Sequence, residues 1–250
     1  KMANTEEGDV RFVTETIPSV YKAIATGSSE DTEEEEFLVY LPKSYDETEN
    51  AQKLYPVVYL FHQLNSSPHS YVMDHIDQIL DKGIEEGTIP EVIVVIPDSA
   101  PESWWMGGWD QMVVKEILPY VEEKYRAYGD REHRFTAGAS MGGHGSYYIG
   151  LSHPDIFGGM ISFYGAINMG ADPLSMAERM EGEVLSSFKY YFICGNRDLY
   201  KFGIPAIQLD RLLREQGIDH FFELGEGAHD SSFYLPYFVD AFGYMLGEGD

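Results

Sequence analysis

The chain has 250 residues, of which 44% are hydrophobic and 24% charged, a composition typical of globular proteins. Its formal net charge of −25 repels nucleic acid and anionic membranes at long range, so both are excluded as partners. The single cysteine, Cys194, excludes an intrachain disulfide, and no apolar stretch approaches the roughly 20 residues that span a bilayer. Composition and charge leave open how many copies of the chain associate.

The first predicted elements are two antiparallel strands, near residues 10–16 and residues 37–41. The acidic run Glu33–Glu36 lies between them, and consecutive like charges are typical of a solvated segment. The sequence therefore predicts a hairpin whose tip carries this run.

Beyond residue 50, short apolar runs alternate with segments of helical periodicity, which predicts a mostly parallel central sheet with helices on both faces. The predicted buried strands are residues 56–61, 92–97, 135–139, 160–164, 190–194 and 221–224. The predicted helices are residues 71–82, 113–125, 143–151, 204–216 and 233–246. With no long linker and no repeat, residues 1–250 are expected to form one α/β domain, in which residues 167–187 can form a short lid.

The segment 135–143 carries Gly-x-Ser-x-Gly at Gly138, Ser140 and Gly142, between a predicted strand and a predicted helix. The bare motif is weak in a chain with 25 glycines, but this context is what a nucleophile elbow requires. Glycine two residues on either side relieves the crowding of a sharp turn, and the helix N-terminus favours a developing anion. Ser140 is therefore the candidate nucleophile.

A serine hydroxyl needs a base, which follows the acid in the chain order of α/β-hydrolases. Downstream of Ser140, His153 precedes a proline at a helix exit, and His220 lies at the amino end of a predicted strand. His229 alone follows a strand at its carboxyl end, where sites of parallel sheets form. We therefore expect His229 to be the general base.

The acid that orients the histidine is expected at the same edge of the sheet. Asp198 is the only acid in the loop after residues 190–194. Asp172, in the preceding loop, is a weaker candidate, and Asp230 is adjacent to His229 and cannot easily reach its ring. The expected triad is therefore Ser140, His229 and Asp198.

Eight ordered segments carry a family resemblance over roughly residues 10–246. They are residues 40–45 (YLPKSY), 55–62 (YPVVYLFH), 116–122 (EILPYVE), 131–134 (REHR), 138–143 (GASMGG), 153–158 (HPDIFG), 195–198 (GNRD) and 227–230 (GAHD). In these segments the chain resembles the esterase D-like and feruloyl-esterase branch of the α/β-hydrolases, which includes family 1 carbohydrate esterases. The resemblance implies an α/β-hydrolase fold and the same three triad residues.

The resemblance also implies an oxyanion hole made by the backbone N–H groups of Leu64 and Met141. This chain has Gln63 where the family commonly has glycine, which puts the local loop geometry in question. The Gln63 amide can alternatively point into the site and touch substrate. His62 is expected to hold the loop by hydrogen bonds.

All three tryptophans, Trp104, Trp105 and Trp109, lie in one loop after residues 92–97. At the carboxyl edge, flat apolar rings suit an aromatic acyl group or a sugar face, although they can equally pack the loop onto the core. In the lid segment, Met169, Leu174, Met176 and Met180 are positioned to contact an apolar acyl chain.

These features predict a serine carboxylesterase that needs no cofactor or metal and acts on a small-molecule or polysaccharide-linked ester. The resemblance favours feruloyl esters of plant polysaccharide. The alternatives are an acetyl-xylan esterase, an S-formylglutathione-type hydrolase, or a carbohydrate-binding relative without activity. Residues 1–5 lack an apolar signal core, so either a signal was removed upstream or the chain is cytosolic; we expect secretion.

Overall fold

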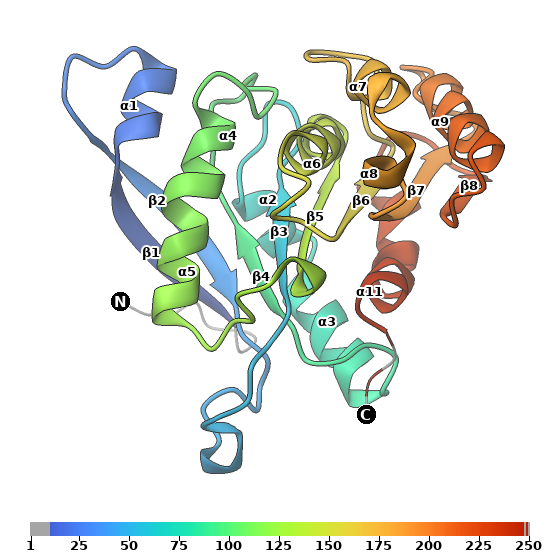
Figure 1. Cartoon of the computed structure of the whole chain (residues 1–250). Coiled ribbons are helices and arrows are strands. Elements are labelled where there is room, and N and C mark those ends of the chain that lie inside the picture. The colour runs from blue at the N-terminus through green and yellow to red at the C-terminus, as the bar shows by residue number, and fades with distance from the viewer. Residues whose placement is uncertain (1–10, 248, 250) are drawn as a thin grey trace.

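Eight strands form one open sheet in the computed structural model, which describes residues 11–247 and 249 (Figure 1). The strands are β1 (Phe12–Ser19), β2 (Glu33–Tyr40), β3 (Val57–Phe61), β4 (Ile93–Ile96), β5 (Arg134–Ala139), β6 (Gly159–Phe163), β7 (Lys189–Gly195) and β8 (Phe221–Gly225). Their order is β1-β2-β4-β3-β5-β6-β7-β8. The pairs β1–β2 and β2–β4 are antiparallel, and the pairs from β4 to β8 are parallel. The predicted fold class, an α/β-hydrolase with antiparallel N-terminal strands, is confirmed.

Helices cover both faces of this sheet. They are α1 (Val20–Thr26), α2 (His69–Met73), α3 (Ile76–Glu85), α4 (Trp109–Met112), α5 (Leu118–Lys124), α6 (Met141–Ser152), α7 (Pro173–Arg179), α8 (Gly182–Leu185), α9 (Gly203–Glu215), α10 (Ser231–Tyr234) and α11 (Phe238–Leu246). Strand β3 shows why two layers are needed. Val57, Tyr59 and Phe61 join the apolar cluster of α4 and α5, whereas Val58 and Leu60 join that of α3 and α11 (Figure 1). Successive side chains of a strand point to opposite faces, so a wholly apolar strand must be covered twice.

The N-terminal hairpin differs from the prediction. The acidic run lies in β2 rather than at a tip, and α1 connects the two strands. Residue 10, at the predicted start of the first strand, lies outside the described residues. The run alternates as a strand does, with Glu35 buried between the exposed Glu34 and Glu36. The prediction that the acidic run forms a hairpin tip is therefore wrong. Pairing of β2 with its neighbours outweighs the repulsion between consecutive carboxylates.

The buried carboxylate of Glu35 has two partners. Lys22 Nζ lies 3.1 Å from its Oε2, and the backbone N–H of Asp98 donates to its Oε1 at 3.1 Å. Burial raises the pKa of Glu35 to about 7, although Lys22 and the Asp98 N–H favour the charged form. The group thus links β2 to the loop that follows β4.

Three predicted helices are interrupted. The segment 71–82 divides into α2 and α3 at Asp74 and His75, and His75 has a left-handed φ of 54°. The segment 113–125 begins earlier, at Trp109, and includes a π-helical turn over Val113–Ile117. The segment 233–246 contains a 3-10 turn, Leu235–Tyr237, with Pro236 inside it. The apolar periodicity predicted that helices exist here but did not show these breaks.

The strand register places the expected catalytic residues at one edge of the sheet. Phe61 pairs with Gly138, Ala139 with Phe163, and Gly195 with Gly225, so the carboxyl ends of five strands are level. His62, Ser140 and Tyr164 directly follow these ends, and Asp198 and His229 come three and four residues after theirs. Residues far apart in the sequence therefore meet at this edge.

Candidate active site

Ser140 occupies a strained turn between β5 and α6. Its φ of 55° and ψ of −117° lie where L-residues other than glycine rarely occur. Ser140 N–H donates to Phe163 O of the neighbouring β6 at 3.0 Å, and Ser140 O accepts from His144 N and Ala166 N. These bonds hold the hydroxyl at the tip of the turn.

The glycines of the motif are required by close backbone approach. A Cβ added at Gly142 would lie 1.9 Å from Phe61 O, and one at Gly138 would lie 2.3 Å from Gly142 C. Helix α6 therefore begins directly against the ends of β3 and β5. The first N–H groups of a helix have no partner within it, so that of Met141 is available to a ligand.

Ser140, His229 and Asp198 lie in one hydrogen-bonded series. Ser140 Oγ is 2.9 Å from His229 Nε2, and His229 Nδ1 is 2.9 Å from Asp198 Oδ2. Because a carboxylate accepts but does not donate, the hydrogen of the neutral ring resides on Nδ1. Nε2 is then free to accept the serine hydroxyl proton.

Asp198 is held by two further donors. Tyr200 N–H donates to Asp198 Oδ1 at 2.8 Å, and the thiol of Cys194 donates to Oδ2 at 3.5 Å. Burial, followed by the charge of Asp198, raises the pKa of Cys194 to about 12. The thiol therefore stays protonated and serves as a donor to the carboxylate.

The rejected candidates have structural roles. Asp172 and Asp230 cap the N-termini of α7 and α10. His220 bonds to Ile218 O and to Asp210 at the amino end of β8. His153 ends α6, where burial lowers its pKa.

Three aromatic rings lie beside His229, and none belongs to a sequence motif; the Phe202 ring is 5.6 Å from the imidazole between centroids. The Tyr164 ring lies 4.2 Å from the imidazole between centroids, and the Tyr200 ring lies 4.7 Å away with an interplanar angle of 66°. Tyr164 directly follows β6, and Tyr200 is two residues after Asp198. Their positions after strand ends were the only signal in the sequence that could have identified them.

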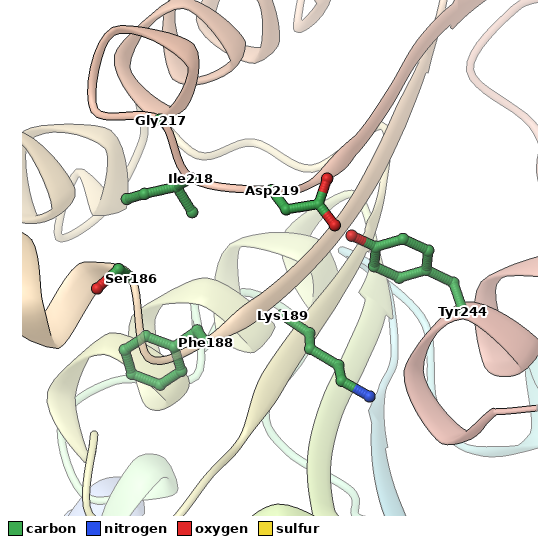
Figure 2. A pocket seen from close by; sticks show the side chains of 7 residues that line it. All are labelled: Ser186, Phe188, Lys189, Gly217, Ile218, Asp219 and Tyr244. Carbon is green, nitrogen blue, oxygen red and sulfur yellow. The ribbon is translucent and has the colours of Figure 1, made fainter.

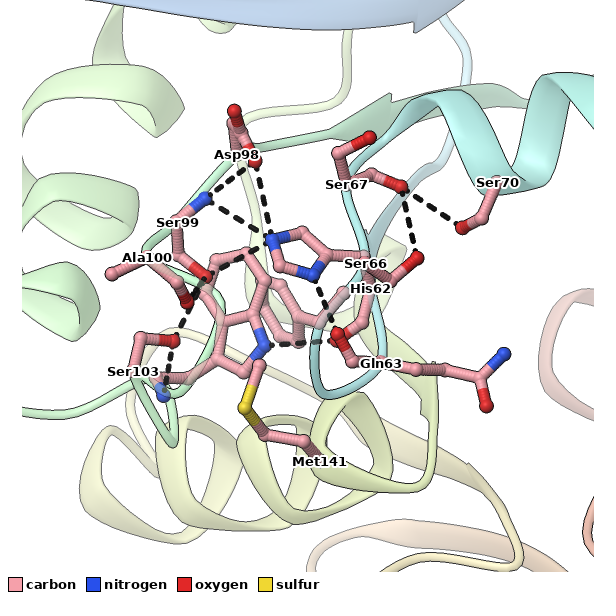
Figure 3. A network of polar contacts seen from close by, with 12 residues as sticks. His62, Gln63, Ser66, Ser67, Ser70, Asp98, Ser99, Ala100, Ser103 and Met141 are labelled. Carbon is pink, nitrogen blue, oxygen red and sulfur yellow. Dashed lines mark hydrogen bonds and ion pairs between the residues drawn. The ribbon is translucent and has the colours of Figure 1, made fainter.

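His62 organises the two loops at the carboxyl ends of β3 and β4 (Figure 3). Its Nδ1–H donates to Gln63 O at 2.9 Å, and its Nε2 accepts from Ser99 N–H at 3.1 Å. The Ser99 hydroxyl lies 3.0 Å from the same nitrogen and 2.8 Å from Ser103 Oγ. His62 thus joins the expected oxyanion loop to the tryptophan loop, the structural role expected from the sequence.

Gln63 does not need the conformational freedom of glycine. It is absent from the non-glycine residues with positive φ in the described part of the chain, whereas Asn65 has a φ of 52°. The turn is therefore made two residues later, where Asn65 N–H donates to Pro101 O at 2.8 Å. The Gln63 side chain points away from His62 in Figure 3, and its Oε1 accepts from Tyr164 OH at 3.4 Å.

The three tryptophans occupy different environments. Trp105 has no exposed surface; it packs on Phe61, and its Nε1–H donates to His62 O. Trp109 is 5% exposed and begins α4. Neither ring presents a face to substrate in this conformation, so the packing alternative describes both. Trp104 remains partly exposed, and its backbone N–H donates to the sulfur of Met141.

The lid segment folds into α7 and α8. Leu174 is buried, whereas Met176 and Met180 pack partly buried against the core. Met169, before α7, is exposed. Ala171 N–H donates to His144 Nε2 at 3.2 Å, which ties this segment to α6 next to the elbow.

A hollow of about 340 Å³ lies at the opposite edge of the sheet (Figure 2). Lys189 begins β7 there, and Ile218 and Asp219 precede β8. The hollow is therefore separated from Ser140 by the length of the strands.

A family comparison agrees with this geometry. Residues 28–182 match the model of the esterase family described as "Putative esterase", which is more than half of the chain. The chain belongs to this esterase family. The elbow of the esterase lies inside the matched region, whereas Asp198 and His229 lie beyond it.

Curated relatives of the esterase include a xylanase/feruloyl esterase and an acetyl esterase. The endo-1,4-beta-xylanase/feruloyl esterase of Xylanibacter ruminicola is 28% identical over 171 residues, covering 64% of the chain and 22% of the relative. The acetyl esterase of Caldicellulosiruptor saccharolyticus is 24% identical over 224 residues, covering 71% and 80%. The chain spans less than a third of the length of the first of these relatives.

Solved structures share the fold. A ferulic acid esterase superposes with a TM-score of 0.80 at 22% identity, covering 95% of this chain and 98% of the other. A CE1 ferulic acid esterase from Anaeromyces mucronatus, in complex with ferulic acid, superposes with a TM-score of 0.71 at 25% identity, covering 97% and 95%. The esterase thus shares the α/β-hydrolase fold with these structures. Among its described helices, none has the length and apolarity needed to span a bilayer.

Proposed function

We propose that this carboxylesterase hydrolyses feruloyl and related hydroxycinnamoyl esters of plant polysaccharide through a Ser140–His229–Asp198 triad. The observation that carries the catalytic part is the hydrogen-bonded series from Asp198 through His229 to Ser140, with both distances at 2.9 Å. Such a series activates a serine hydroxyl that is otherwise a poor nucleophile.

In the first step, His229 Nε2 takes the proton of Ser140 as the oxygen attacks the ester carbonyl carbon. Asp198 keeps the ring hydrogen on Nδ1 and stabilises the imidazolium. The N–H groups of Leu64 and Met141 donate to the oxyanion, where each donor contributes roughly 3–4 kcal/mol. The imidazolium then protonates the leaving alcohol, and an acyl group remains on Ser140.

In the second step, His229 accepts a proton from water, which attacks the acyl carbon, and the same imidazole returns the proton to Ser140 as the acid leaves. The buried Asp198 needs fixed donors to stay oriented through both steps. Tyr200 N–H and the Cys194 thiol supply them.

The preference for an aromatic acyl group is supported by the apolar groups around the elbow. Leu64 and Met169 are exposed, and Trp104 remains partly exposed beside Met141. The xylanase/feruloyl esterase of Xylanibacter ruminicola and the ferulic acid esterase of Anaeromyces mucronatus support the same acyl group by their names. The acetyl esterase among the relatives makes acetylated xylan the second candidate substrate.

Two experiments test the proposal. A fluorophosphonate probe is expected to modify the protein once, at Ser140, and Ser140→Ala is expected to abolish labelling and hydrolysis. Labelling at another residue would contradict the triad. A panel of methyl ferulate, acetylated xylan, p-nitrophenyl acetate and S-formylglutathione then assigns the acyl group. The highest kcat/KM is expected for methyl ferulate, and a higher value for S-formylglutathione would reject the feruloyl assignment.

A further inference from the structure

Exposed apolar side chains are concentrated in the segment that follows Asp198. Leu199 is 90% exposed, Tyr200 is 68% exposed, and Ile204 and Ile207 of α9 are also exposed. Single exposed apolar residues are ordinary, but a group of them beside a reactive centre indicates a binding surface. None of these side chains has a part in the triad chemistry described above, in which Tyr200 takes part only through its backbone N–H.

The Tyr200 ring is fixed at the triad histidine. It meets the His229 imidazole edge to face at 4.7 Å and stacks on Phe202 at 5.7 Å with an interplanar angle of 15°. Its backbone is held because Tyr200 N–H donates to Asp198 Oδ1 and Lys201 N–H donates to Asp198 O. The ring is therefore a rigid, exposed surface.

The chemistry of the reaction decides which part of the substrate meets this surface. The imidazolium must protonate the leaving alcohol, so that oxygen lies within about 3 Å of Nε2. The acyl group lies on the other side of the scissile bond, toward the oxyanion donors. The residue attached to the leaving oxygen therefore lies next to the rings that contact His229, among which Tyr200 is the exposed one.

We infer that Tyr200, with Leu199, forms a leaving-group subsite that binds the sugar of the ester. A pyranose or furanose ring presents C–H groups on one face and hydroxyls at its rim, which suits an aromatic face with water around it. An uncharged sugar is also compatible with the net charge of −25, which would repel an anionic leaving group. The inference rests on the proposed function for the identity of the alcohol.

The test compares two esters of the same acid. The ratio of kcat/KM for a feruloylated arabino-xylo-oligosaccharide to that for methyl ferulate is expected to fall roughly three- to tenfold in Tyr200→Ala. Both esters give the same feruloyl-enzyme, so its deacylation is the same for both and does not affect the ratio. Tyr200→Phe keeps the ring and is expected to retain the ratio. Leu54→Ala, an equally apolar site that is 44% exposed before β3 at the other edge, is the matched control.

The outcomes separate the subsite from the proposed function. An unchanged ratio would overturn the subsite. If both esters are then hydrolysed more slowly by the same factor, Tyr200 is assigned to the positioning of His229 instead. If methyl ferulate is not hydrolysed, the feruloyl proposal fails. The subsite is then measured with acetylated xylo-oligosaccharide against methyl acetate, and the same fall in the ratio is expected.

Discussion

Replacing Glu35 with glutamine should change the way in which stability depends on pH. Glu35 has no exposed side-chain surface and lies between Lys22 and the backbone N–H of Asp98. Glutamine keeps the shape and can accept the same N–H, and Lys22 retains its bond to Glu34 O at 2.8 Å. The substitution therefore removes the ionisation with little change in packing.

The size of the effect follows from the pKa. Burial raises the pKa of Glu35 from an ordinary value of 4.5 to about 7, which corresponds to about 3 kcal/mol. Below 4.5 the group is protonated in both states and costs nothing. Between pH 4.5 and 7 the group ionises in the unfolded chain but stays protonated in the folded protein, so the folded state loses stability over this range; above pH 7 both states are ionised and the loss stays constant.

Urea unfolding of both proteins at pH 5 and pH 8 measures this difference. The variant is expected to be more stable by about 1 kcal/mol at pH 5 and by about 3 kcal/mol at pH 8. Glu36→Gln, an exposed neighbour on the same strand, is the control and should leave the pH dependence unchanged. The reasoning would be refuted if the stability difference between Glu35→Gln and wild type did not grow from pH 5 to pH 8. It would also be refuted if the wild-type protein were more stable than the variant at pH 8.

Four shorter predictions concern the site. Gly142→Ala should destabilise the fold by at least about 1–3 kcal/mol in urea unfolding, because its Cβ would meet Phe61 O. His229→Ala should lower kcat by several orders of magnitude with the fold intact; retained turnover on methyl ferulate would identify a different base. Trp105→Ala should cost about 3–5 kcal/mol of stability and lower aryl and acetyl ester hydrolysis alike, whereas a selective loss would place the ring in the acyl site. Cys194, whose pKa is raised to about 12, should react with a thiol reagent at pH 8 only after unfolding; rapid labelling of the folded protein would contradict its burial.

The parallel part of the fold was predictable because its strands are largely apolar, and β3 and β4 are apolar and buried throughout. The runs predicted at residues 56–61 and 190–194 correspond to β3 and β7. The acidic β2 was missed, since nothing in a row of four glutamates shows that the second and fourth face solvent while Glu35 faces Lys22. Local charge describes an average environment, and the alternation of a strand is decided by its partner.

The candidate site also contains residues that could be predicted from the sequence and residues that could not. Each of Ser140, Asp198 and His229 follows a strand end, and strand ends converge in a parallel sheet, so their meeting could be expected from order alone. The burial of Trp105 could not be predicted from the sequence, because it depends on Gly145 of α6, whose missing side chain leaves room for the ring. The role of Tyr200 could not be predicted either, because it depends on the contact between its ring and the His229 imidazole.

The location of the tryptophans has a spectroscopic consequence. All three lie within residues 104–109, and Trp105 is enclosed by Phe61, His62 and Gly145 where the loop after β3 meets helix α6. Tryptophan fluorescence of this protein therefore originates in one short segment, in which Trp104 and Trp105 contact helix α6 directly after Ser140. A change in tryptophan emission on adding a ligand therefore reports on this part of the fold alone. Local unfolding at the amino ends of the parallel strands would leave the emission unchanged.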